Sequence, residues 1–216
     1  MKKKRYSHVI WDWNGTLLND VDWCIKQISQ MLAKRNKRIL LNTSEYHAAF
    51  CFPIVDYYRN IGFDFTKEPF EFLAKEYIEM YHGEGSAGIS LHSNAEYVLK
   101  ALQNLQVSQS ILSASAQGNL EMQLKPFKIQ QYFDEVLGIS DIYAKSKLEV
   151  GLDYLARNNV QNCIMIGDTV HDFEVSQAMG IDCALVANGH QSKEKLMQCD
   201  TPVFDNLNEV LYFVEG

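Results

Sequence analysis

The sequence reads Ser7-His8-Val9-Ile10-Trp11-Asp12-Trp13-Asn14-Gly15-Thr16-Leu17-Leu18 near its start. The apolar run from Val9 to Trp11 predicts a buried β-strand that ends at the carboxylate of Asp12. Asn14 and Gly15 end the strand, because both residue types favour turns and tolerate a positive φ. In open α/β sheets, ligands bind at the carboxyl ends of the strands. The pattern therefore predicts either an active-site acid or a strand that simply ends in a polar turn, and the rest of the chain must decide.

Length and composition exclude several classes of protein. The chain has 216 residues, which is enough for one domain with a large insertion. Its net charge of −7 argues against nucleic acid or an anionic membrane as the main partner. No stretch approaches the length of a membrane helix, and the basic opening Met1 to Arg5 lacks the apolar run of a signal peptide. The five scattered cysteines suit a reducing compartment, so a cytoplasmic location is expected.

Residues 19 to 87 are predicted to be all-helical, because apolar residues recur there at helical spacing and no alternating strand pattern is present. A helix capped by Asn19 or Asp20 is followed by predicted helices over Glu45–Phe50, Ile54–Ile61 and Pro69–Tyr81. The glycine-rich stretch from His82 to Ile89 predicts a flexible connector that returns the chain to its main domain.

The rest of the chain alternates between strand and helix patterns. Strands are expected over Val107–Leu112, Glu135–Ile139, Cys163–Ile166 and Asp182–Val186, with helices over Asn94–Leu105, Asn119–Phe127, Leu148–Asn158 and Phe173–Met179. Leu152 and Leu155 are expected on the apolar side of their helix. This alternation predicts an α/β fold with a doubly wound, Rossmann-like parallel sheet. Residues 1–18 and 88–216 would form this core domain, and residues 19–87 an inserted all-helical domain.

A second strand also ends at a carboxylate. The chain reads Ile166-Gly167-Asp168-Thr169-Val170-His171-Asp172, and Asp172 falls at the start of the next helix, where negative charge is favoured. Asp12 and Asp168 offer hard oxygen ligands without a cluster of cysteine and histidine, which suits Mg²⁺ rather than zinc.

The two acidic stretches resemble motifs of the haloacid dehalogenase (HAD) superfamily. Its first motif, Asp-x-Asp-Gly-Thr-Leu, stands here as Asp12 to Leu17, with Asn14 in place of the usual second aspartate. Its last motif, Gly-Asp-x-x-x-Asp, stands as Gly167 to Asp172 and is followed by Ala178-Met179-Gly180. The helical insertion resembles the cap of the class that includes phosphoglycolate phosphatases.

The resemblance implies a metal and phosphate site. Asp12, Asp168 and the backbone carbonyl of Asn14 would ligate Mg²⁺, and Asp172 would bind through water or orient the others. Ser113 hydroxyl and Ala114 N–H would hold phosphate oxygens. The family also needs a lysine before its last motif, and Lys147 is favoured over Lys145 because it directly precedes a predicted helix.

The resemblance further implies hydrolysis of a small phosphorylated metabolite through an aspartyl-phosphate on Asp12. In the usual enzyme, the second aspartate protonates the leaving group and later activates water. Asn14 can do neither, and such acid–base help contributes roughly 10²–10⁴-fold. We therefore expect slow turnover of alkyl phosphates, faster turnover of aryl phosphates and a long-lived aspartyl-phosphate.

Other functions stay open at this stage. A phosphonate hydrolase of the same superfamily would need a lysine in the insertion, for which Lys26, Lys34 and Lys37 are candidates. A catalytically impaired protein that binds a phosphorylated ligand would also explain Asn14. A GTPase or kinase is not expected, because the chain has no Gly-x-x-x-x-Gly-Lys-Ser/Thr loop. The oligomeric state is not predicted.

Two further stretches are candidates to border the site. Phe50-Cys51-Phe52-Pro53 and Tyr57-Tyr58 either face the substrate or form the core of the insertion, and their aromatic density favours the core. The loop Gly189-His190-Gln191-Ser192 follows the last predicted strand.

Overall fold

The computed structural model describes residues 6–84, 86–139 and 147–216 and is built on a six-stranded parallel sheet. The strand order is β5-β4-β1-β6-β7-β8, so β1 lies in the middle. The strands are β1 (His8–Trp11), β4 (Ser108–Ala116), β5 (Glu135–Ile139), β6 (Cys163–Gly167), β7 (Asp182–Val186) and β8 (Val203–Phe204).

Helices cover both faces of the sheet, and this confirms the predicted doubly wound α/β fold. Val9 and Trp11 of β1 belong to an apolar cluster that contains residues of α5 (Ala95–Asn104), α6 (Gln117–Leu124) and α10 (Leu207–Glu215). Ile10 points to the other face and joins residues of α7 (Leu148–Asn158) and α8 (Val170–Met179). This alternation is expected of a central strand, since successive side chains point to opposite faces.

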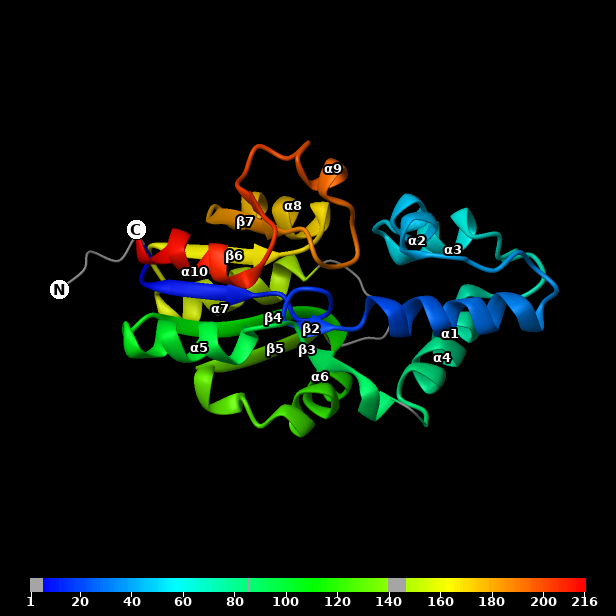
Figure 1. Ribbon diagram of the computed structural model, residues 1–216, viewed down its shortest axis with the longest axis horizontal. Helices are drawn as coiled ribbons and strands as arrows, with labels where there is room; N and C mark the ends of the chain where they lie inside the picture. The colour runs from blue at the N-terminus through cyan, green and yellow to red at the C-terminus, as the bar shows by residue number, and fades with distance from the viewer. Residues whose placement is uncertain (1–5, 85, 140–146) are drawn as a thin grey trace.

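Helices α1 (Val21–Lys34), α2 (Thr43–Ala49), α3 (Ile54–Asn60) and α4 (Phe70–Tyr81) lie beyond one end of the sheet and form what we call the helical layer (Figure 1). They have an apolar cluster of their own, rich in tyrosine and phenylalanine. Asn42 caps α2 by accepting a hydrogen bond from Glu45 N at 2.9 Å. The C-terminus lies at the opposite end of the sheet from this layer (Figure 1).

A two-stranded antiparallel ribbon connects the sheet to the helical layer. Its strands are β2 (Leu18–Asn19) and β3 (Ser90–Leu91). The sequence predicted only connecting loops here, because strands of two residues are too short to show a periodic pattern. The ribbon places the outgoing and returning crossings of the chain side by side.

Some predicted boundaries differ from the structure. Strand β4 does not end before Ser113 but continues to Ala116, with a shift of its register against β5 between Leu112 and Ala116. The expectation for Leu152 was wrong, since this residue is 43% exposed while its neighbours Gly151 and Tyr154 are buried. The sequence analysis also missed β8, α9 (Lys193–Leu196), α10 and the short 3-10 turns Ser86–Gly88 and Gln130–Tyr132. The predicted helix that ends at Phe127 is α6 followed by a 3-10 turn over Lys125–Phe127. Within the described part of the chain, no helix is both long and apolar enough to cross a membrane.

Candidate active site

The two strand–acid junctions meet at one edge of the sheet. Strands β1 and β6 are neighbours, and Asp12 and Asp168 directly follow their last paired residues. Asp172 lies in the first turn of α8. Each of the three residues offers a carboxylate oxygen to a group whose atoms all lie within 4.8 Å of one another, and all three side chains are buried.

Lys147 provides the positive charge at this cluster. It is the residue just before α7, and its Nζ lies 2.5 Å from Asp12 Oδ1 and 2.7 Å from Asp172 Oδ1. Nζ also donates to the Leu112 carbonyl at 2.9 Å, which joins β4 and the start of α7 to the acids. Burial opposes the charged form of Lys147, but the two carboxylates outweigh it and raise its pKa. Lys145, the other candidate, lies outside the described residues.

Asp168 is held by two donors from different loops. Its Oδ1 accepts from Thr16 Oγ1 at 2.8 Å, and its Oδ2 accepts from the backbone N–H of His190 at 2.6 Å. Gly15 leaves room for this contact: it has a φ of +80°, and a Cβ there would overlap both Asp168 and His190. The glycine in the first motif is therefore required by backbone conformation and by space.

Asp172 fixes the start of α8 as well as the lysine. Thr169 and Asp172 form a capping box, and Asp172 Oδ2 accepts from the backbone N–H groups of Asp168 at 3.2 Å and Thr169 at 3.0 Å. Burial opposes ionisation of Asp172, but Lys147 outweighs it and lowers the pKa of this carboxyl. With both oxygens engaged, Asp172 is suited to orient its neighbours.

The charges at the site do not balance, and the residues present fit a divalent cation. Burial raises the pKa of Asp12 to about 8, even though Lys147 acts against the rise. Burial likewise raises the pKa of Asp168 to about 6. Three buried carboxylates with one lysine leave surplus negative charge that a cation would neutralise. An all-oxygen donor set of this kind is the set that Mg²⁺ prefers.

Ser113 and Ala114, the predicted phosphate-binding residues, line one cavity together with Asp12 and Lys147. Ser113 is buried, and its Oγ accepts from the Ser115 backbone N–H at 3.1 Å. Ser115 in turn donates through Oγ to Asn14 Oδ1 at 2.9 Å. The end of β4 therefore contacts the loop that follows β1.

The Asn14 side chain is fixed at both ends. While its Oδ1 accepts from Ser115, its Nδ2 donates to Asp20 Oδ2 at 2.8 Å. Tyr81, at the end of α4, donates to the same Asp20 oxygen at 2.7 Å. The amide of Asn14 is thus a bridge between β4 and the start of the helical layer.

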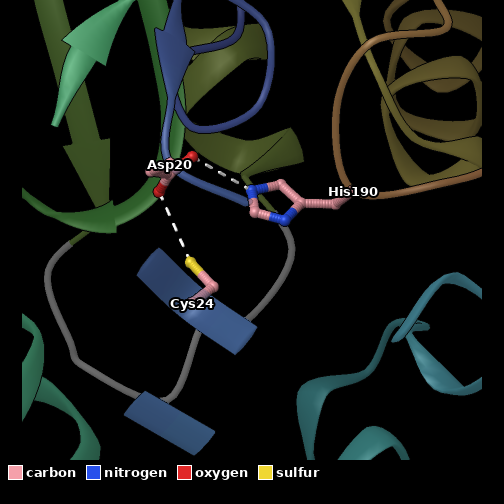
Figure 2. A group of neighbouring side chains, drawn as sticks. All are labelled: Asp20, Cys24 and His190. Atoms are coloured by element: carbon pink, nitrogen blue, oxygen red, sulfur yellow. Dashed lines mark hydrogen bonds and ion pairs between the residues drawn. The ribbon is translucent and has the colours of Figure 1, made fainter. Parts of the chain in front are cut away.

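Asp20 lies between Cys24 and His190, as Figure 2 shows. Its Oδ1 is 3.4 Å from His190 Nε2, and its Oδ2 accepts from Cys24 Sγ at 3.6 Å. Burial opposes the charge on His190, but Asp20 outweighs it and raises the histidine pKa to about 9. Because Asp20 also accepts from Gly15 N at 3.0 Å and from Asn14 and Tyr81, its oxygens are fully used. An ion pair with local hydrogen bonds therefore accounts for this trio.

A cavity of about 180 Å³ joins the acids to the helical layer. The aromatic stretches identified in the sequence both form the core of the helical layer and line this cavity. Phe50, Tyr57 and Tyr58 belong to the core of the helical layer and also line the cavity, as does the less buried Phe52. His190 also lines the cavity and contacts Tyr46 Oη through Nδ1 at 2.8 Å.

The lysine candidates for a phosphonate hydrolase lie elsewhere. Lys34 forms an exposed ion pair with Glu76 at 2.9 Å, and Lys26 Nζ lies 5.0 Å from the centroid of the Trp23 ring. Neither these two lysines nor Lys37 lines the cavity that holds Asp12, so the structure gives this alternative no support.

The sequence analysis missed Thr16, Asp20, Ser115 and Tyr81. Thr16 lies inside the first motif, and Ser115 lies two residues after Ser113, so their position was a usable signal. Asp20 was considered only as a helix cap, and its side chain makes no capping hydrogen bond to α1. Tyr81 reaches the site only because α4 packs against α1, and no local sequence pattern predicts this packing.

Comparison with known proteins agrees with this geometry. The family model of the haloacid dehalogenase-like hydrolases matches residues 9–186, and the chain belongs to this family. The chain is thus a member of a family of hydrolytic enzymes, as the motifs predicted.

The chain is similar in sequence to a tyrosine-protein kinase and in fold to two solved structures. The tyrosine-protein kinase PtkA of Mycobacterium tuberculosis is 29% identical over 140 residues, which are 61% of this chain and 48% of the kinase. The chain therefore aligns with about half the length of that relative. A haloacid dehalogenase-like hydrolase from Streptococcus pneumoniae has a TM-score of 0.83 at 18% identity and covers 97% of this chain and 98% of its own. A predicted phosphoglycolate phosphatase from Haemophilus somnus has a TM-score of 0.78 at 15% identity, with coverages of 97% and 98%.

Proposed function

We propose that this hydrolase is a Mg²⁺-dependent phosphatase that cleaves a small phosphate monoester through an aspartyl-phosphate on Asp12. The observation that carries the proposal is the placement of Lys147 Nζ between Asp12 and Asp172, at the end of a cavity that Ser113 also lines. A buried lysine beside a carboxylate at the carboxyl edge of the sheet suits the transfer of an anionic group.

Asp12, Asp168 and the backbone carbonyl of Asn14 would hold the Mg²⁺, and Asp172 would position Lys147 and the Asp168 backbone. The bound ion would act as a Lewis acid toward the phosphoryl oxygens. Replacing the aspartate side chain at position 14 by an amide leaves that backbone ligand in place.

In the proposed reaction, Asp12 is the nucleophile and other side chains bind the phosphoryl oxygens. A carboxylate oxygen of Asp12 attacks phosphorus, and the bond from phosphorus to the leaving oxygen breaks. Lys147, with the Ser113 hydroxyl and the Ala114 N–H, holds the phosphoryl oxygens as charge develops on them. Water then attacks the phosphorus of the aspartyl-phosphate, which releases phosphate and restores Asp12.

The helical layer would act as a cap over this chemistry, with residues 19–87 as one domain and residues 1–18 and 88–216 as the other. Support comes from its own apolar cluster and from the ribbon at its two crossings. A cavity that opens between layer and sheet would enclose a metabolite and exclude bulk water. A cytoplasmic location remains part of this proposal.

Release of phosphate from p-nitrophenyl phosphate tests the proposal. We expect Mg²⁺-dependent release that Asp12→Asn abolishes, while the matched change Asp22→Asn on the exposed side of α1 leaves it unchanged. Equal activity of the Asp12→Asn and unchanged proteins would refute the assignment of the nucleophile. Absence of release from both, together with tight phosphate binding, would favour the impaired binding protein.

The similarity to PtkA favours one second candidate, a kinase that transfers phosphate to tyrosine. The absence of a P-loop excludes only kinases that use that loop. Incubation with ATP and a tyrosine-containing peptide separates the two functions, because a phosphatase leaves the peptide unmodified.

A further inference from the structure

The two ends of the cavity have opposite chemistry. Asp12, Asp172, Lys147 and Ser113 form the polar end, where the phosphoryl group is proposed to bind. The helical layer forms the other end almost entirely from apolar and aromatic side chains. These are Tyr46, Phe50, Phe52, Ile54, Tyr57, Tyr58, Phe70, Ala74, Tyr77, Ile78 and Tyr81. A nucleophile at the polar end directs the leaving group toward this wall.

The aromatic rings of the wall contact one another. The ring centroids of Phe50 and Tyr57 are 5.2 Å apart, and those of Tyr58 and Phe70 are 5.4 Å apart in an edge-on arrangement. Phe52 stacks on His171 at 4.4 Å, which continues the aromatic surface onto α8. Such a surface favours a flat aromatic guest, which can pack edge-on or offset against the rings.

Among the described residues that line the cavity, no positively charged side chain is free to bind a ligand. Lys147 is engaged by Asp12, Asp172 and Leu112, and His190 is paired with Asp20. The buried polar atoms without a hydrogen-bond partner in this part of the structure include Tyr57 Oη and His171 Nε2, which belong to lining residues. A carboxylate on the leaving group would lose its water and could gain single hydrogen bonds from Tyr57 or His171, but it would find no free lysine or arginine to balance its charge.

We propose that the leaving group is a phenolate whose ring carries no other charged group, so that the substrate of this site is an aryl phosphate monoester. This inference rests on the proposed phosphatase function and names its substrate class. The size of the cavity agrees, since an apolar cavity of about 150 Å³ in another protein binds benzene. The space of about 180 Å³ here suits a single ring beside the phosphoryl group.

The amide at position 14 points to the same class independently. Asn14 has no proton to give, and its Nδ2 is already bonded to Asp20. When Asp12 attacks, the bond from phosphorus to the aryl oxygen breaks, and that oxygen keeps the electron pair as a phenolate. A phenol has a pKa of about 10, several units below the pKa of water, so the phenolate departs without the help of a general acid. It takes its proton from solvent afterwards.

Binding of inert phosphonates tests the inference separately from leaving-group reactivity. With Mg²⁺ present, calorimetry should show that benzylphosphonate binds at least about tenfold more tightly than phosphonoacetate, because only the ring buries apolar surface. Equal binding, or tighter binding of phosphonoacetate, would overturn the inference.

A charge placed in the wall supplies the matched test. Ile78 lines the cavity and is half-buried, so Ile78→Lys can be accommodated with Ile78→Met as its size-matched control. The lysine should shift the preference toward phosphonoacetate by about tenfold or more, as expected of a charge-assisted contact, and methionine should keep the preference for benzylphosphonate. An unchanged preference in the lysine variant would show that the wall does not contact the leaving group.

Rates of phosphate release distinguish a free phenol from a tyrosine side chain, and they separate the substrate class from the phosphatase function. Phenyl phosphate and a phosphotyrosine peptide should both be cleaved faster than phosphoglycolate, and the faster of the two identifies a free phenol or a tyrosine side chain. Cleavage that requires Asp12 but favours phosphoglycolate would overturn the substrate class alone. Tight benzylphosphonate binding without any cleavage would overturn the phosphatase function and leave the aromatic recognition standing.

Discussion

The side-chain amide of Asn14 donates to Asp20 Oδ2 at 2.8 Å, so the residue that replaces the usual second aspartate is hydrogen-bonded to an aspartate six positions later. Tyr81 donates to the same oxygen, and His190 pairs with the other one. An aspartate at position 14 would place a partly buried carboxylate against the buried carboxylate of Asp20. The substitution is therefore coupled to Asp20 and to the helical layer.

Exchanging the two residues should restore alkyl phosphatase activity. In Asn14→Asp alone, the new carboxyl lies against Asp20, so we expect a destabilised protein with a small gain. In the double variant Asn14→Asp/Asp20→Asn, an acid can serve the leaving group, and kcat on an alkyl phosphate should rise by up to roughly 10²–10⁴-fold. Steady-state kinetics on alkyl and aryl phosphates measure this, and aryl turnover should change less. A double variant without gain on alkyl phosphates would contradict this account of Asn14.

Gly15→Ala should remove activity because of the contact with Asp168. A positive φ costs a non-glycine residue about 1–2 kcal/mol, and a Cβ here also meets Asp168 and His190. Gly62→Ala is the matched control, since Gly62 has a φ of +99° but its Cβ would meet nothing within 4 Å. Thermal unfolding should show a destabilisation in both variants that is larger in Gly15→Ala, and phosphate release should be lost only in Gly15→Ala. Full activity in Gly15→Ala would mean that the Asp168 contact is not needed.

Lys147→Met should damage both stability and activity. Leaving Asp12 and Asp172 without their partner breaks a buried ion pair, which typically costs about 3–5 kcal/mol, and phosphoryl charge loses a donor worth about 10²–10³-fold in kcat. Lys193→Met is the control, because Lys193 pairs with Asp205 at the surface and such pairs contribute roughly 0–1 kcal/mol. Denaturant unfolding and kcat measured on the two variants should differ accordingly. Comparable kcat values for the two would exclude Lys147 from the site.

The stabilisation by Mg²⁺ should grow with pH. Because burial raises the pKa of Asp12 to about 8 and that of Asp168 to about 6, the stability tied to their protonated forms is present at low pH and is lost as the pH rises through these values. Mg²⁺ binds the ionised carboxylates and should replace the lost stability in the same range. The increase in melting temperature caused by Mg²⁺ should therefore be small near pH 5 and larger near pH 9. A shift that is independent of pH would place the ion elsewhere.

The parts of the fold that local sequence determines were predicted well. The apolar runs that end at Asp12 and Asp168 predicted neighbouring strand ends, because parallel strands bring their carboxyl ends to one edge of the sheet. Helix α1 of the insertion begins at Val21, directly after the predicted cap positions Asn19 and Asp20. Ser113 and Lys147 were identified through the family resemblance and their order along the chain; Lys147 Nζ contacts Asp12, and Ser113 lines the same cavity.

What could not be predicted depends on contacts between distant segments. Tyr81 meets Asp20 only after α4 packs on α1, and Ser115 meets Asn14 only because β4 continues past Leu112. Leu152 is exposed although it fits a helical pattern, since Gly151 and Tyr154 occupy the buried side of α7. Short elements such as β2 and β3 contain too few residues to show any period.

Trapping the covalent intermediate tests the central claim most directly. The enzyme is mixed with p-nitrophenyl phosphate and Mg²⁺, quenched in acid, digested and analysed by mass spectrometry. We predict one phosphoryl group on the peptide that contains Asp12, labile to hydroxylamine, and accumulating because Asn14 does not activate water. Phosphate release without any modification of that peptide, or a phosphoryl group found at another residue, would contradict the assignment of Asp12 as the nucleophile.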